Sequence, residues 1–156
     1  DWDMTLFPDP DSPTTPTISP VNGQIHSIHL AGAGNMVTLL IQSEMGLPDF
    51  DTAEDVKKYP LAKWELFHIR HENGTVEFFQ QPLDPNLFAK VVILKEGKLL
   101  PLEGELELEK IRLIRQQAKQ KVFVTNAIRA LTRVSPTGNV RDIQFVVLVG
   151  GSALDF

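Results

Sequence analysis

The chain has no cysteine, which excludes a disulfide scaffold and a thiol nucleophile and fits a reducing compartment. It lacks any apolar run near the roughly 20 residues that a membrane-spanning helix needs, and no basic-then-apolar pattern marks an export signal. Basic residues are fewer than acidic ones, and the net charge is −5. The overall charge therefore does not favour binding to nucleic acid or to an anionic membrane. What is present, 156 residues of which 42% are hydrophobic, suits one globular domain with its own core.

Residues 1–20 differ in composition from the remainder. The segment FPDPDSPTTPTISP holds five prolines in 14 residues, which is incompatible with a helix and predicts disorder or a tether. Orderly patterns begin at Val21. We therefore expect a disordered or aberrant segment over residues 1–20 and a folded region over residues 21–156.

Three regular elements are predicted next. GQIHSIHLA alternates apolar and polar residues, as a strand does, and GAG then precedes a helix with Asn35 as N-cap and Gly46 as C-cap. One face of that helix carries the apolar residues Met36, Val37, Leu40, Ile41 and Met45. DTAEDVKKY predicts a short helix capped by Asp51 or Thr52, with its acids early and its lysines late, as the helix dipole favours.

The remaining sequence adds further strands and a long helix. WELFHIRHENGTVEFF predicts a hairpin around Asn73-Gly74, the pair preferred in type I′ turns. Residues 87–94 are ambiguous between helix and strand, and EGKLLPLEG resembles a loop. Residues 106–134 predict a helix that KVFVT could interrupt, followed by a buried strand at Val146–Val149. The apolar stripe of this predicted helix comprises Ile111, Ile114, Ala118, Val122, Ile128 and Leu131. This order of elements predicts a mixed α/β fold.

Two motifs are weighed against simpler interpretations. DWDMT matches the Asp-x-Asp-x-Thr loop of haloacid-dehalogenase phosphatases, but no strand precedes Asp1 and prolines follow Asp3, so we interpret it as a chance match. The pairs His26/His29 and His68/His71 are each three residues apart on predicted strands. Odd spacing sends the two rings to opposite faces, so neither pair can chelate a metal alone.

The segment 110–141 contains eight Lys or Arg residues and no acid. A nucleic-acid-binding helix is one interpretation. Aromatic residues are scarce there, however, and four glutamates lie just upstream. We therefore favour a solvated helix face or one that docks on an acidic partner.

Two glycine-rich turns and one helix are candidate ligand-binding segments. Backbone N–H groups near Gly32 and Gly34 could approach a phosphate at a helix N-terminus. Gly150-Gly151 leaves room for a flat ring, or serves only as a tight turn. On the AEDVK helix, Glu54 and Lys57 share a face and could clasp the vicinal hydroxyls of a ribose; the alternative is an ordinary surface ion pair.

The order strand, glycine turn, helix, AExxK helix and VVLVGG strand resembles the second half of the actin-like ATPase fold. More narrowly, HLAGAGNMVTLLI, AEDVKKYPLAK, LFHIRHENGTVEFF, KVFVTNAIRAL, VSPTGNVRDI and FVVLVGGSALDF resemble the large subunit of diol/glycerol dehydratase reactivases. The resemblance implies a partial actin-like (ribonuclease H-like) α/β ATPase domain with a β-hairpin insertion.

That resemblance also implies a function. The family's large subunit is an ATP-dependent chaperone that partners a small subunit and releases damaged cobalamin from adenosylcobalamin-dependent dehydratases. ATP or ADP with Mg²⁺ would be its cofactor, and neither nucleic acid nor a membrane its partner. The implied adenosine contacts are Glu54 and Lys57 by side chain, with Ala53, Asp55 and Val56 as pocket wall, and Gly150 and Gly151 as the floor; Gly32 and Gly34 would approach the phosphates.

Two departures from the family pattern qualify this picture. Where family members carry a DLGAGSTD phosphate loop, this sequence has DPDSPTTPT, and it stops after SALDF where a helix should follow. We therefore expect a truncated C-terminal half of the ATPase domain, inactive alone, from a cytoplasmic protein whose association with a bacterial microcompartment is left open. Another actin-like nucleotide-binding protein and a phosphatase using Asp1 and Asp3 remain alternatives.

Overall fold

The computed structural model describes residues 14–21, 24–31 and 33–147. They belong to two compact units, one formed by Asp1–Val37 with Lys119–Phe156 and the other by Thr38–Ala118. Each unit is described by itself. The described residues confirm the predicted mixed α/β class, and both sheets are antiparallel.

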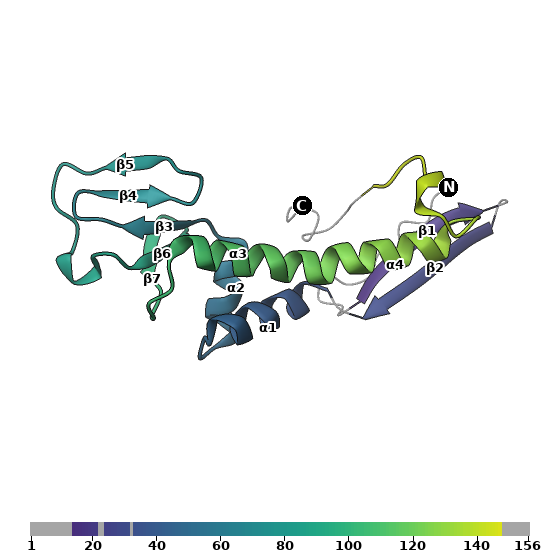
Figure 1. The fold of residues 1–156 in the computed structure, drawn as a ribbon, viewed down its shortest axis with the longest axis horizontal. Helices are drawn as coiled ribbons and strands as arrows, with labels where there is room; N and C mark the ends of the chain where they lie inside the picture. Colours follow the sequence, from purple (N-terminus) through teal and green to yellow (C-terminus); the bar gives the residue numbers. More distant parts are fainter. Residues whose placement is uncertain (1–13, 22–23, 32, 148–156) are drawn as a thin grey trace. The chain divides into compact units, whose positions relative to one another are not determined.

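The first unit contains a two-stranded sheet and a helix. Strand β1 (Thr14–Val21) pairs with β2 (Gln24–Ala31), and helix α4 (Thr125–Val134) packs on both strands (Figure 1). The buried side chains of α4 include Ala130 and Val134. A short 3₁₀ turn at Val140–Asp142 follows the helix.

Strand β1 differs from the disorder expected over residues 1–20. Its two prolines, Pro16 and Pro20, are four residues apart and therefore share one edge of the strand. A strand in a two-stranded sheet has one unpaired edge, which accepts residues that lack an N–H. Proline content thus excluded a helix correctly but did not exclude an edge strand. Residues 1–13 lie outside the described residues.

The second unit is built around a five-stranded sheet. Its strands are β3 (Leu61–Trp64), β4 (His68–His71), β5 (Val76–Phe78), β6 (Val91–Lys95) and β7 (Lys98–Pro101), in the order β5-β4-β3-β6-β7. A core of Ala62, Trp64, Ile69 and Val92 lies on one face of this sheet. Helix α2 (Phe50–Lys58) contacts β6, and a 3₁₀ turn at Pro85–Leu87 precedes that strand.

Two of the hairpins in this sheet refine the sequence prediction. The predicted β4–β5 hairpin is confirmed, but Asn73 does not have a positive φ and only Gly74 does, at +87°. The loop is therefore a three-residue connection with a glycine bulge, not a type I′ turn. The expected loop after Lys95 instead forms β7, and its Glu96-Gly97 turn has φ of +50° and +78°, the type I′ signature.

Helix α1 (Gly34–Met45) follows β2 and ends as predicted. Gly46 has φ of +66° and the Leu47 N–H donates to the Gln42 carbonyl, a glycine C-cap. Asn35 is inside the helix, one residue after its start, so the predicted N-cap is wrong. Val37 and Ile41 are fully buried, whereas Met36 is 46% exposed.

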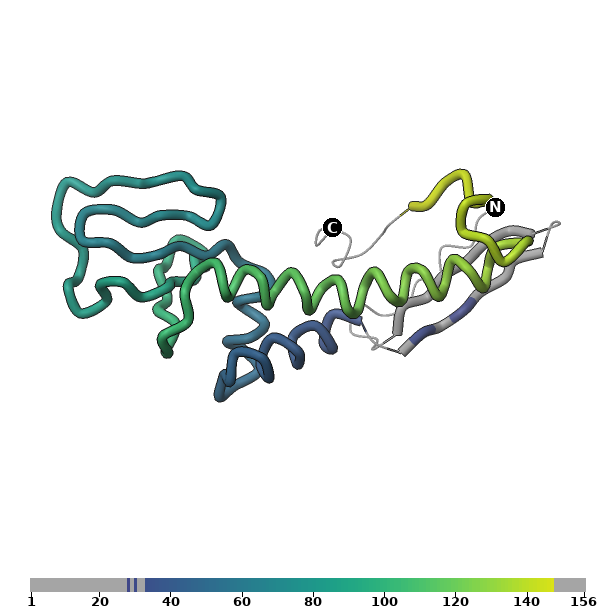
Figure 2. Tube along the Cα trace, in the orientation of Figure 1, coloured from purple at the N-terminus to yellow at the C-terminus, as the bar shows by residue number. Residues whose placement is uncertain are grey.

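The long C-terminal helix is regular except for one turn. Helix α3 (Leu108–Lys119) leads into a π-helical turn at Gln120–Val124, the place where KVFVT was expected to interrupt the pattern (Figure 2). A π turn takes up one residue more than an α turn. The predicted stripe holds as far as Val122 and then fails: Ile128 is 54% exposed, and the buried positions beyond the turn are Asn126, Ala130 and Val134.

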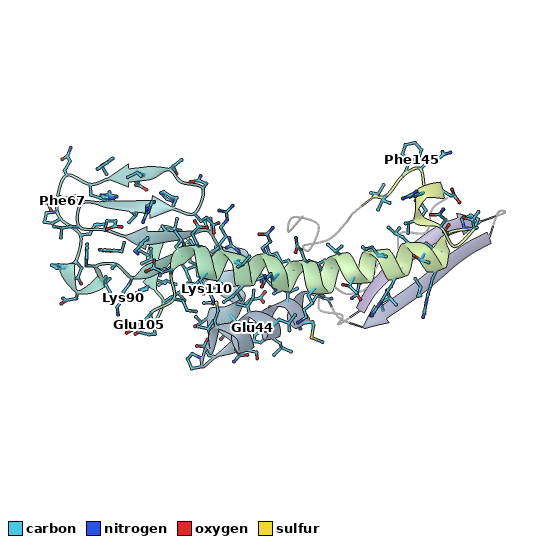
Figure 3. All side chains as sticks on the ribbon, in the orientation of Figure 1. Glu44, Phe67, Lys90, Glu105, Lys110 and Phe145 are labelled. Atoms are coloured by element: carbon cyan, nitrogen blue, oxygen red, sulfur yellow. The ribbon has the colours of Figure 1, made fainter. Side chains whose placement is uncertain are left out.

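The predicted terminal strand is not formed in the residues described. Residues 143–147 belong to no helix or strand, and Phe145 and Val147 are 85% and 82% exposed. Phe145 projects away from the backbone (Figure 3). Leu148, Val149 and the double glycine lie outside the described residues.

Candidate functional site

Helix α2 carries the residues on which the site prediction depends. The helix begins two or three residues earlier than expected, because Asp49 is its N-cap and accepts a 2.6 Å hydrogen bond from the Thr52 N–H. Thr52 is therefore a donor to the cap, and neither it nor Asp51 is the cap itself. Lys57 and Lys58 occupy the last turn, as predicted from the helix dipole.

Glu54 is the centre of a small ionic cluster. Its Oε2 accepts from Lys57 Nζ at 2.6 Å and from the Thr38 hydroxyl of α1, while its Oε1 accepts from Lys58 Nζ at 2.7 Å. Lys57 Nζ also donates to Thr38 Oγ1 at 2.8 Å. Thr38 is fully buried and Lys57 is 6% exposed, whereas Lys58 is 58% exposed. The pair Glu54–Lys57 is therefore mostly internal.

The electrostatics of this cluster fix the charge of Glu54. Burial pushes the pKa of its carboxyl upward, but hydrogen bonds from Lys57, Lys58 and Thr38 outweigh this and lower the pKa from 4.5 to about 2. The same ion pair raises the pKa of Lys58. Glu54 is thus a carboxylate under all physiological conditions.

This lowered pKa predicts an acid-sensitive contribution to stability. Because the folded-state pKa of Glu54 lies below 4.5, the carboxylate stabilises the fold above that pH, and the contribution disappears as pH falls toward 2. We expect Glu54→Gln to remove about 2 kcal/mol of the pH dependence of the unfolding free energy. Urea denaturation between pH 6 and 2.5 measures it, with exposed Glu44→Gln as the control. Parallel curves for all three proteins would contradict the prediction.

The other predicted residues of α2 lie in distinct surroundings. Ala53 and Val56 have no exposed surface. Asp55 accepts two hydrogen bonds, each 2.8 Å long, from Lys95 of β6. The Lys95 ammonium also lies 5.5 Å from the centre of the Tyr59 ring.

The predicted glycines are only partly covered by the described residues. Gly34 is the first residue of α1, at the expected passage from strand to helix. Gly32, Gly150 and Gly151 lie outside the described residues. The structure thus brings together Glu54 and Lys57, and it adds Thr38 and Lys58, which the sequence analysis missed. The i,i+4 spacing of Lys58 from Glu54 was a usable signal, but nothing local connects Thr38 with a residue 16 positions later.

Two hollows open on the second unit. One, of about 420 Å³, lies beside the β4–β5 turn and the start of α3; the other, of about 200 Å³, is bordered by Glu44 and Glu105 among others, which are labelled in Figure 3. Helix α2 borders neither of these two hollows.

His68 and His71 of β4 contact neighbouring residues of the sheet, whereas the side chains of His26 and His29 lie outside the described residues. His68 packs on Phe78 with ring centres 5.2 Å apart, and His71 Nε2 lies 3.4 Å from Glu77. Within the described ranges, no cluster of three or more His, Asp or Glu side chains could hold a metal ion. In the basic segment, Arg112 pairs with Glu109.

Among the described residues, no helix is both long enough and apolar enough to cross a membrane.

Comparison with known proteins defines the class first. The domain description "Diol dehydratase reactivase ATPase-like domain" matches residues 13–156. The region is thus part of an ATPase-like domain. The chain belongs to the diol dehydratase reactivase family.

Individual relatives agree with this assignment. The chain is 64% identical over 135 residues to the propanediol dehydratase-reactivating factor large subunit of Citrobacter freundii and 63% identical to the diol dehydratase-reactivating factor large subunit of Klebsiella michiganensis, covering 86% of this chain but 22% of each relative. A solved glycerol dehydratase reactivase is 62% identical with a TM-score of 0.84, and a nucleotide-free diol dehydratase-reactivating factor is 59% identical with a TM-score of 0.85; each match covers 92% of this chain and 24% of the other. These matches favour neither the phosphatase nor another actin-like protein.

Proposed function

We propose that this chain is part of the large subunit of an ATP-dependent reactivating factor, which releases damaged cobalamin from an adenosylcobalamin-dependent diol or glycerol dehydratase. The observation that carries the proposal is the 64% identity to a reactivating-factor large subunit over 135 residues. The partners would be the reactivase small subunit and the dehydratase itself, and the complex would act as a chaperone in the cytoplasm. The domain would have the actin-like fold, and ATP or ADP with Mg²⁺ would bind in the complete protein.

The chemistry of α2 fits a nucleoside. A carboxylate has about four acceptor positions, and Glu54 uses three of them for Lys57, Lys58 and Thr38. The remaining position, on Oε1, can accept a ribose hydroxyl. Because Lys57 is buried, the exposed ammonium of Lys58 is the better placed donor at the surface, with Lys57 holding Glu54 in position.

The remaining residues of the proposed site contribute less directly. Ala53 and Val56 would shape the wall by supporting α2 from the core, and Asp55 would fix the helix through Lys95. Gly150 and Gly151 would bed the adenosine, and Gly32 and Gly34 would approach the phosphates. No described residue is assigned to Mg²⁺, since no acidic cluster of the required kind occurs among the residues described.

The proposal predicts different behaviour for the isolated chain and a full-length subunit. We expect the isolated chain neither to hydrolyse ATP nor to bind it with micromolar affinity, because α2 supplies one wall and nucleotide affinity needs burial from two sides. A full-length large subunit that carries this sequence, mixed with its small subunit, should restore activity to a dehydratase inactivated with damaged cobalamin when ATP is added. Calorimetry and a dehydratase assay measure the two. Tight ATP binding by the isolated chain, or no reactivation by the full-length complex, would contradict the proposal.

A further inference from the structure

Arg115 of helix α3 connects three segments that are distant in the sequence. The side chain is 14% exposed. One guanidinium nitrogen donates to the backbone carbonyls of Val56 at 3.3 Å and Tyr59 at 3.2 Å, and the other donates to the Glu72 carboxylate. Arg115 therefore contacts the C-terminal end of α2 and the β4–β5 turn at the same time.

The second partner of this arginine is itself fixed to the sheet. Glu72 lies in the β4–β5 turn and its N–H donates to the Leu61 carbonyl at 2.9 Å, at the start of β3. Leu61 comes two residues after Tyr59. The end of α2, the start of β3 and the hairpin turn thus form a closed set of contacts around one guanidinium.

An arginine suits this position for physical reasons. The last carbonyls of a helix have no partner within the helix, and a cation near them interacts favourably with the helix dipole. The planar guanidinium offers several donors in a fixed geometry, so it can satisfy two carbonyls and a carboxylate together, which a lysine ammonium cannot do with the same directions. The contacts are made to the backbone of α2, so they fix the helix itself.

We infer that Arg115 is a positioning residue for the nucleotide-contacting helix and that it couples the β4–β5 hairpin to that helix. The inference rests on the proposed function of α2. Glu54 is two residues before Val56, only about 3 Å along the helix axis, so a displacement of the Val56 carbonyl moves the Glu54 carboxylate as well. Arg115 would thereby set where Glu54 meets the ribose, without touching the nucleotide.

The test uses a full-length large subunit that carries this sequence. The variants are Arg115→Lys and, as matched control, Arg112→Lys, which lies one turn earlier on α3, is 54% exposed and pairs with Glu109. Calorimetry gives the affinities for ATP and 2′-deoxy-ATP, and thermal unfolding gives stability. We expect Arg115→Lys to lower ATP affinity about tenfold and to reduce the preference for ATP over the deoxy nucleotide, while Arg112→Lys changes neither by more than about twofold.

The ratio of the two affinities separates positioning from stability. A merely structural role would lower the melting temperature and weaken both nucleotides equally, leaving the ratio unchanged, and that result would overturn the inference. If Arg115→Lys does not fold, Glu72→Gln is tested in its place, because this variant weakens only the contact between Arg115 and the β4–β5 turn. A reduced ratio of ATP affinity to 2′-deoxy-ATP affinity supports the inference, and an unchanged ratio overturns it.

Glu54→Gln distinguishes this inference from the function on which it rests. If Glu54→Gln loses the preference for ATP and Arg115→Lys keeps it, only the inference about Arg115 fails. If Glu54→Gln keeps the preference, the proposed ribose contact fails and the positioning role fails with it.

Discussion

Replacing Glu54 by glutamine is expected to lower the ATP affinity of a full-length large subunit by about ten- to a hundredfold. If Glu54 contacts the ribose as proposed, the variant removes a charge-assisted hydrogen bond to a ribose hydroxyl, which would contribute roughly 1.5–3 kcal/mol. Calorimetric titration with ATP and with 2′-deoxy-ATP measures the effect. The unmodified protein should prefer ATP, and Glu54→Gln should bind both nucleotides alike. Unchanged ATP affinity would return Glu54 to a purely structural role.

The same substitution is also expected to destabilise the fold. An exposed helical ion pair would contribute only about 0.3–0.5 kcal/mol, but Lys57 is 6% exposed, so loss of the Glu54 charge leaves a buried ammonium poorly compensated. We expect a loss of about 2–3 kcal/mol. Lys58→Gln serves as the control, because Lys58 is 58% exposed and its pairing with Glu54 should contribute less than about 1 kcal/mol. Equal losses in both variants would contradict the burial argument.

Trp64→Ala is expected to be the most destabilising single change in the five-stranded sheet. Trp64 is 7% exposed and packs with Ala62, Ile69 and Val92. Truncating a buried tryptophan removes its packing and leaves a cavity, at a cost of about 3–5 kcal/mol. Urea denaturation of the chain measures this loss.

Trp64→Phe provides a matched control for that prediction. In the described part of the chain, the buried indole Nε1 has no hydrogen-bond partner. Phenylalanine keeps most of the ring and removes this unpaired donor, so the smaller volume and the lost polar group offset each other. We expect a change below about 1.5 kcal/mol. A Trp64→Phe variant as unstable as Trp64→Ala would contradict this offset and would mean that the full volume of the indole, which phenylalanine does not fill, is needed at this position.

Of the five strands of the sheet, the sequence analysis predicted only β4 and β5; it predicted no separate strand at residues 61–64, left residues 87–94 ambiguous between helix and strand, and expected a loop where β7 forms. The β4–β5 hairpin was found because alternating residues flank Asn73-Gly74, but the pair alone did not distinguish a two-residue turn from a three-residue one. The type I′ turn occurs instead at Glu96-Gly97, where glutamate gives no turn signal. Strand β7 was missed because its local composition resembles a loop. The strand forms through its pairing with β6, which the local composition does not show.

The candidate site shows the same division between local and distant signals. The position of α2 and the shared face of Glu54 and Lys57 follow from spacing and charge order within nine residues. The burial of Lys57 does not, because it depends on Thr38 of another helix. Likewise, Arg115 contacts the end of α2 across a sequence separation of 59 positions for Val56 and 56 positions for Tyr59. No local sequence pattern predicts such a contact.

Lys57 and Lys58 are adjacent in the sequence, yet one ammonium is enclosed with a carboxylate and a hydroxyl while the other is mostly in solvent. An amine-reactive reagent reacts only with an unprotonated and accessible amine, so these neighbours differ in chemical reactivity although their side chains are the same. The ratio of acylation at the two positions is therefore an internal measure of whether α2 is seated on α1. Because the two lysines are adjacent and are modified in the same sample, each serves as the reference for the other, and the ratio needs no external standard.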